Sequence, residues 1–123
     1  MEIIKRSLGR IALILEYTRM GEDVCLVLTG GDRPHCGAVA VAQVRESLST
    51  RGKLSSTVSN ITLLGHKEDV LARRLASRVA VAVAANAVVC CGIHLDDISA
   101  DEITAILDAA DDMTNEAIEG LKP

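Results

Sequence analysis

Tyr17 is the single aromatic side chain among tyrosine, phenylalanine and tryptophan in this sequence. Large aromatic side chains usually supply much of the buried area of a core, so this core must be built from valine, isoleucine, leucine and alanine. The same scarcity excludes a surface on which nucleotide bases stack. A net charge of −4 and a pI near 5.3 also argue against a nucleic-acid partner. We therefore expect a soluble, aliphatic domain that does not bind nucleic acid.

The chain length and the cysteines bound the organisation of the protein. The 123 residues predict a single domain over residues 1–123, large enough to form a core without disulfides or a structural metal. The apolar run 11–15 is too short for a signal peptide, and the apolar stretch 79–93 is too short to span a bilayer. No small secreted framework spaces its cysteines as this chain does, so we expect free thiols, reducing cytoplasm and no membrane partner. The four cysteines are Cys25, Cys36, Cys90 and Cys91.

The hydrophobic periodicity changes from strand-like to helical along the chain. Alternation and β-branched runs predict strands early, and apolar residues at steps of three and four predict helices later. Strands are expected at 11–19, 24–29, 37–45, 54–64 and 87–93, and helices at 67–85 and 100–118. The order β-β-β-β-α-β-α predicts an α/β (α+β) two-layer sandwich, a mostly antiparallel sheet covered by two helices.

Three of these elements carry more detailed expectations. In residues 37–45 valine and alanine alternate, so the valine face suits the sheet core and the alanine face lets a helix or a second chain approach closely. Residues 54–64 are polar and belong near a sheet edge, whereas the apolar residues 87–93 are expected to be buried on both faces. Ser99 and Glu102 have the spacing of a capping box that opens the last helix.

The three histidines each follow a glycine-containing break and have an aspartate nearby. The segments are Gly-Gly-Asp-Arg-Pro-His (30–35), Gly-His-Lys-Glu-Asp (65–69) and Gly-Ile-His-Leu-Asp (92–96). Loops at strand ends are where α/β folds place binding groups, so these segments are expected to meet in one polar site.

Each segment has a functional and a structural interpretation. Gly30 and Gly31 form either an anion cradle or a simple turn leaving a strand. Residues 65–67 form either an anion site at a helix start, with Lys67 adding a charge, or an ordinary helix start. His94 is either an acid/base or ligand oriented by aspartate, or part of a solvated turn.

Metal and thiol chemistry are alternatives. The three histidines could form a zinc centre, although the chain contains no Cys-x-x-Cys pair. Cys36, beside His35, is the candidate reactive thiol, while the other cysteines are expected in the core. Tyr17 is expected on the core or sheet face, and it is also the only aromatic platform available to a flavin ring.

Taken together, the three segments resemble those of the LpdD-like family, small proteins associated with gallate-type decarboxylases that use prenylated flavin. The resemblance covers roughly residues 10–118. It implies a fold like that of the small proteasome-assembly chaperones. It also implies an accessory, chaperone-like role rather than a catalytic one, with prenylated FMN or FMN as cofactor and a flavin-dependent decarboxylase as partner.

The resemblance further implies that the matching residues cluster as a cofactor site. These residues are Gly30, Gly31, Asp32, His35, Gly65, His66, Lys67, Asp69, His94 and Asp96. Two other functions stay open. One is a homodimeric interaction protein without a small ligand, which would use the alanine face of residues 37–45 and short exposed strand edges as its interface. The other is a small three-histidine metalloenzyme.

Overall fold

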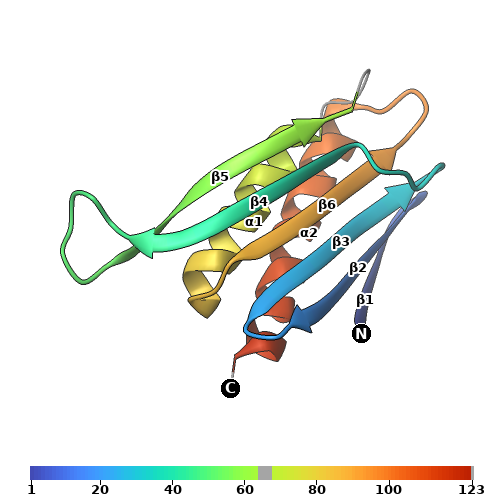
Figure 1. The fold of residues 1–123 in the computed structure, drawn as a ribbon. Helices are drawn as coiled ribbons and strands as arrows, with labels where there is room; N and C mark the ends of the chain where they lie inside the picture. The colour runs from blue at the N-terminus through green and yellow to red at the C-terminus, as the bar shows by residue number, and fades with distance from the viewer. Residues whose placement is uncertain (64–67, 123) are drawn as a thin grey trace.

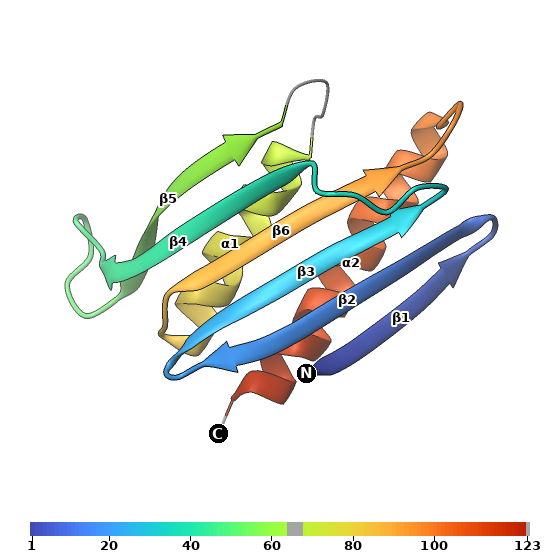
Figure 2. The same cartoon turned by 45° about the vertical axis from the view of Figure 1, so that its right-hand side comes forward.

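Six strands form one sheet, and both helices pack against the same face of it (Figure 1, Figure 2). The computed structural model describes residues 1–63 and 68–122. The elements are β1 (Glu2–Leu8), β2 (Ile11–Met20), β3 (Asp23–Gly31), β4 (Ala38–Glu46), β5 (Leu54–Thr62), α1 (Asp69–Val83), β6 (Ala87–His94) and α2 (Ala100–Leu121). Across the sheet the strands run β1-β2-β3-β6-β4-β5. β3 and β6 are parallel, and the other neighbours pair antiparallel.

The structure confirms the predicted class, an α+β two-layer sandwich with a mostly antiparallel sheet. From residue 11 onward the elements follow the predicted order. β1 stands in front of them as a strand that the sequence did not predict, because Glu2, Lys5 and Arg6 interrupt its apolar pattern. The polar strand β5 pairs only with β4 and lies at the sheet edge, as expected.

An aliphatic core fills the space between the sheet and the helices. Every second residue of the central strands is buried, and each helix contributes one apolar stripe. Leucine, isoleucine, valine and alanine dominate this core, as the scarcity of aromatic residues predicts. Its largest fully buried side chains include Leu13, Leu15, Leu26, Leu28, Leu75, Val79, Val89 and Met113.

In strand β4, where alanine and valine alternate, the buried face is the opposite of the one expected from the sequence. Ala38, Ala40 and Ala42 are fully buried against α1, whereas the valine side of the strand faces away from the helices, with Val41 39% exposed. The alanine side therefore lets a helix approach closely and cannot serve as the interface with a second chain. The prediction that the valines enter the core was wrong because small side chains are what a closely packed helix requires.

Strand β6 is buried on one face only, whereas its apolar sequence predicts burial on both faces. Val89 and Cys91 are fully buried beneath the helices, but Val88 and Cys90 on the opposite side are only half-buried. Both helices cover the same face, so within residues 1–63 and 68–122 no second layer covers the other. A continuous apolar run therefore does not mark burial on both faces here.

The start of α2 is fixed as the sequence predicts. The Ser99 side chain accepts a hydrogen bond from the Glu102 backbone N–H, and the Glu102 carboxylate accepts one from the Ser99 N–H, which completes the capping box. Arg10, in the turn between β1 and β2, donates to the same carboxylate at 2.8 Å. These bonds, with the Arg10 guanidinium first, lower the pKa of Glu102 to about 2.

Candidate functional site at one end of the sheet

Two of the three glycine–histidine segments meet at one end of the sheet. Because β3 and β6 are parallel neighbours, their carboxyl ends lie side by side, and Gly31 stands opposite His94 in the register. The two loops that leave these strands are also joined by hydrogen bonds. The Asp32 N–H donates to the His94 carbonyl at 2.6 Å, and the Asp96 N–H donates to the Asp32 carboxylate at 2.9 Å. The predicted meeting of residues 30–35 with residues 92–96 is thus present.

His94 lies between a cation and a carboxylate. Its Nε2 atom is 2.7 Å from an Arg33 guanidinium nitrogen and 2.9 Å from the Asp96 carboxylate. One nitrogen cannot both accept from Arg33 and donate to Asp96, so the protonation state of His94 decides which bond forms. The hydrogen bond from His94, followed by the charge of Arg33, lowers the pKa of the Asp96 carboxyl. All three side chains reach solvent, so the Arg33 guanidinium and the His94 imidazole are accessible to an anionic ligand.

His35 forms a second cluster with Glu68. Its Nδ1 atom lies 2.9 Å from the Arg33 carbonyl, and its Nε2 atom lies 3.0 Å from the Glu68 carboxylate. Both partners are acceptors, so both bonds form only when the ring is doubly protonated or the carboxyl itself carries a proton. The two rings of His35 and His94 lie edge to face, with centroids 6.4 Å apart. The two clusters therefore form one polar site.

Glu68 is the site residue that sequence analysis missed. It directly precedes α1, with its side chain 14% exposed, and its carboxylate also accepts a 3.4 Å hydrogen bond from the Ile93 N–H at the end of β6. From the sequence alone, Glu68 is simply an acidic residue at a helix start, where it complements the helix dipole. Its position in the segment between the histidine and the aspartate was the signal that could have identified it.

The glycines of the site allow close packing of its backbone. A Cβ on Gly92 would overlap the His35 carbonyl, and a Cβ on Gly31, which has φ +78°, would overlap the His94 carbonyl. A Cβ on Gly30 would overlap the Ala12 carbonyl of β2. Packing within the protein thus accounts for these glycines, and an anion cradle at Gly30 and Gly31 stays a prediction.

The third segment is described only in part. Gly65, His66 and Lys67 lie outside the described residues. Asp69 opens α1 next to Glu68, and its carbonyl accepts a 3.4 Å hydrogen bond from the Asn60 side chain.

Two cysteine sulfurs touch at the border of the site. Cys36 Sγ lies 3.4 Å from Cys90 Sγ, and all four cysteines are free. Burial raises the pKa of Cys90 to about 11 and that of Cys91 to about 12. Cys91 belongs to the core, as expected, while Cys25 and Cys90 are half-buried on the side of the sheet away from the helices.

The described part of the chain bears on the metal, membrane and aromatic-platform alternatives. In residues 1–63 and 68–122, no group of three or more histidine, cysteine or acidic side chains could hold a metal ion. Neither described helix is long and apolar enough to cross a membrane. Tyr17 is buried against Gly120 of α2, so it cannot serve as a platform for a flavin ring at this site.

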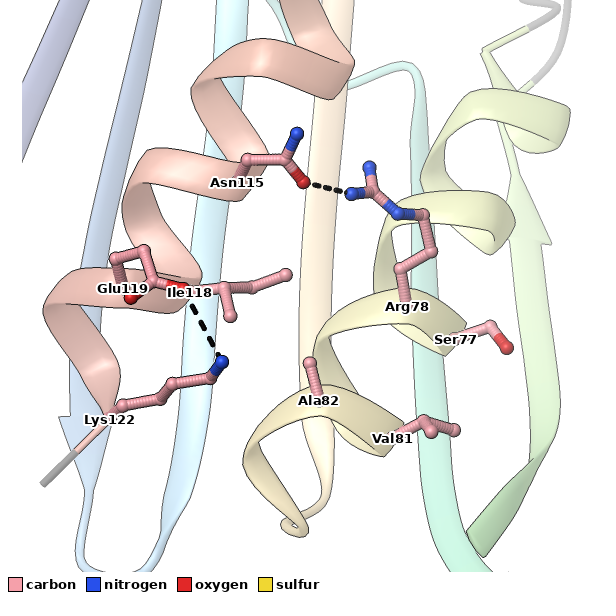
Figure 3. Close-up of a pocket in the computed structure, with 8 residues that line it drawn as sticks. All are labelled: Ser77, Arg78, Val81, Ala82, Asn115, Ile118, Glu119 and Lys122. Atoms are coloured by element: carbon pink, nitrogen blue, oxygen red, sulfur yellow. Dashed lines mark hydrogen bonds and ion pairs between the residues drawn. The ribbon is translucent and has the colours of Figure 1, made fainter.

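A groove of about 570 Å³ lies between the second halves of α1 and α2, at the other end of the helices from the site (Figure 3). Its polar side chains pair with one another. Arg78 points to Asn115 and also contacts Asp111, while Lys122 pairs with Glu119. This groove therefore offers no uncompensated charge to a ligand.

The fold and the site define a small α+β protein whose polar cluster joins the ends of two parallel strands to the start of a helix. Residues 7–122 match the model of the prenylated flavin chaperone LpdD-like domain. The chain is also similar to Protein LpdD of Lactiplantibacillus plantarum, with 29% identity over 105 residues, covering 84% of this chain and 72% of that protein. The chain belongs to the prenylated flavin chaperone LpdD-like family, which confirms the resemblance and supports a chaperone-like role.

Proposed function

We propose that this chain is an accessory protein that binds prenylated FMN, or FMN, and supports a flavin-dependent decarboxylase in the cytoplasm. The family match carries this proposal, because it covers nearly the whole chain. The convergence of the motif residues at one sheet end supports it, since a shared site explains why separated segments carry the same residue types.

The residues present fit such a ligand. The exposed Arg33 guanidinium is a donor suited to a phosphate. The sulfurs of Cys36 and Cys90, which touch at the border of the site, offer an apolar edge to an isoalloxazine ring and its prenyl addition. When bound, the flavin supplies the reactive ring system for the partner enzyme, while this chain holds and shields it.

In this proposal each motif residue has a role in binding. His66 and Lys67, with Gly30 and Gly31, bind the phosphate, and His35 and His94 lie near the ring. The remaining proposed binding residues are Asp32, Gly65, Asp69 and Asp96, which hold the loops or contact the ligand. The protein works as a homo-oligomer, with a dimer as the expected form.

Binding titrations of prenylated FMN against three variants test the placement. We expect Arg33→Ala to weaken binding by about 10-fold or more, since an Arg–phosphate pair contributes roughly 1.5–3 kcal/mol. The double substitution His66→Ala/Lys67→Ala is expected to do the same. Arg73→Ala, which removes an exposed arginine of α1, is the matched control. Unchanged affinity in both site variants would reject this placement.

The partner is tested separately by capture of the decarboxylase with flavin-loaded and flavin-free protein. Preferential capture by the loaded form supports delivery of the cofactor. Equal capture by both forms instead favours an assembly role that needs no small ligand.

A further inference from the structure

The side of the sheet opposite the helices is apolar at its centre. We call this side the open face, because no described element covers it (Figure 1, Figure 2). Strand alternation assigns its side chains, since their neighbours along each strand are buried beneath the helices. Its central members are Ile14, Thr18, Cys25, Val27, Thr29, Val39, Val41, Val88 and Cys90.

The register makes this apolar region continuous. Val27 of β3 stands beside Cys90 of β6, which in turn stands beside Val39 of β4. One step along the strands, Val88 stands between Cys25 and Val41. An uninterrupted region of this kind on a folded protein marks an interaction surface rather than scattered surface apolar residues.

The distribution of charge favours a second copy as the occupant. The chain carries −4 overall, and α2 contains seven acidic and no basic residues, so two copies repel through their helix sides. The open face instead has two acidic side chains, Glu16 of β2 and Asp23 of β3, balanced by two basic ones, Lys5 of β1 and Arg45 of β4. The open-face residues Val88 and Cys90 of β6, with Val39 and Val41 of β4 beside them, are uncharged, and the charged groups around them are of mixed sign. Two acidic copies can therefore meet there with little repulsion.

The size of the open face also matches what a dimer needs. Six strands spaced about 4.8 Å apart, each seven to ten residues long at about 3.3 Å per residue, cover roughly 800 Å². Two such faces give about 1,600 Å², within the usual range for stable interfaces. Sheets of valine and threonine pack face to face at about 10 Å, and a two-fold axis makes one such surface complementary to itself.

We propose that a second copy of this chain covers the open face, sheet against sheet. This inference rests on the self-association included in the proposed function and names the surface responsible. It also puts the ligand site at the rim of the interface, because His35 crosses Gly92 at the end of β6 and Cys36 touches Cys90 on the open face.

Sedimentation velocity on the full chain and two matched variants tests the surface. Val41→Lys puts a charge on the open face, and Val81→Lys puts the same charge on α1; the two valines are 39% and 37% exposed. We expect the wild type to sediment at twice the 13.0 kDa of one chain. Val41→Lys should raise the dimer Kd by at least about 100-fold, because each copy would bury a charge, and Val81→Lys should leave it unchanged.

A second variant covers the case in which Val41→Lys fails to fold by circular dichroism. Ser59→Arg places a charge on the exposed edge strand β5, directly beside Val41 in the register, and should also weaken the dimer. A wild type that is monomeric at about 100 µM overturns the inference. A dimer that survives in the folded open-face variants, or that Val81→Lys disrupts equally, overturns it as well.

Flavin binding, measured in the same samples by native mass spectrometry, separates this inference from the proposed function. A wild-type monomer that retains prenylated FMN rejects the interface and keeps the binding role. If the wild type is a dimer, Val41→Lys is a monomer and neither retains flavin, the proposed interface is supported and the binding role is rejected.

Discussion

His35 Nε2 lies 3.0 Å from the carboxylate of Glu68, although 33 residues separate the two in the chain. The contact joins the loop after β3 to the start of α1, and both side chains are largely buried, with 21% and 14% exposed. The other ring nitrogen of His35 lies 2.9 Å from the Arg33 carbonyl, so the imidazole bridges the backbone of its own loop and the Glu68 side chain. This buried pair holds the loop of the candidate site in place.

Replacement of the Glu68 carboxylate by an amide should destabilise the protein. We expect Glu68→Gln to lower the free energy of unfolding by about 1–3 kcal/mol, because it removes a charge-assisted bond between largely buried groups. Urea denaturation measures the change. Glu119→Gln is the control, since that side chain is 74% exposed and should change stability by no more than about 0.5 kcal/mol. Equal effects of the two substitutions would show that the His35 contact contributes nothing.

Gly31 and Gly52 have nearly the same left-handed backbone conformation. Alanine substitutions at these two positions therefore distinguish the cost of backbone strain from the cost of steric overlap. Gly31 has φ +78° and Gly52 has φ +81°, but a Cβ would overlap the His94 carbonyl at Gly31 and would meet nothing within 4 Å at Gly52. Gly52→Ala should cost about 1–2 kcal/mol from the left-handed conformation alone. Gly31→Ala should cost more by at least about 2 kcal/mol, because the backbone of the site must shift. Thermal or urea unfolding compares them, and similar losses would contradict the close backbone packing.

The capping carboxylate of α2 predicts a pH dependence in the acid range. The pKa of Glu102 is lowered from 4.5 to about 2 in the folded protein, so its ionised form stabilises the fold. That stabilisation is present above about pH 4.5 and is lost as the pH falls toward 2. Glu102→Gln keeps a capping partner but removes the charge. The difference in unfolding free energy between wild type and variant should therefore begin to shrink near pH 5 and continue to shrink toward pH 2 (roughly the interval set by the unfolded and folded pKa values); a constant difference would contradict the Arg10 contact.

The contact of Cys36 with Cys90 predicts selective oxidation. The thiol oxidant diamide should join these two sulfurs, which already touch, with a mass loss of about 2 Da. Cys91 should stay reduced, because it is fully buried beneath the helices and out of reach of the oxidant, whereas Cys90 lies on the open face. Peptide mapping of the oxidised protein identifies the linked residues. Cys36→Ser should abolish the link, and a disulfide that forms equally well through Cys91 would contradict the geometry.

Local patterns predicted most of the fold. Strand alternation, the helical steps of the last third of the chain and the Ser99–Glu102 spacing depend on interactions between residues close in sequence, and each is confirmed. The sequence did not predict β1, because its polar residues interrupt the apolar alternation of a strand. The segment forms a strand nevertheless, because it pairs with β2 along its whole length. The orientation of β4 was also missed, since both of its faces are apolar and only the position of α1 decides which one is buried.

The site was predicted less completely than the fold. The sequence placed residues 30–35 and 92–96 together because strand ends meet at one edge, and the structure brings them into contact. It did not identify Glu68, whose role depends on a contact made across the tertiary structure with His35 and Ile93. It also allowed Tyr17 a ligand-binding role that burial against α2 excludes.

Native mass spectrometry of the anaerobically purified protein, with and without added FMN and prenylated FMN, tests the central claim most directly. The proposed function predicts that prenylated FMN is retained at one molecule per chain, in preference to FMN. It also predicts that Arg33→Ala loses this adduct while Arg73→Ala keeps it. A folded wild-type protein that retains neither flavin at concentrations well above micromolar would contradict the binding role.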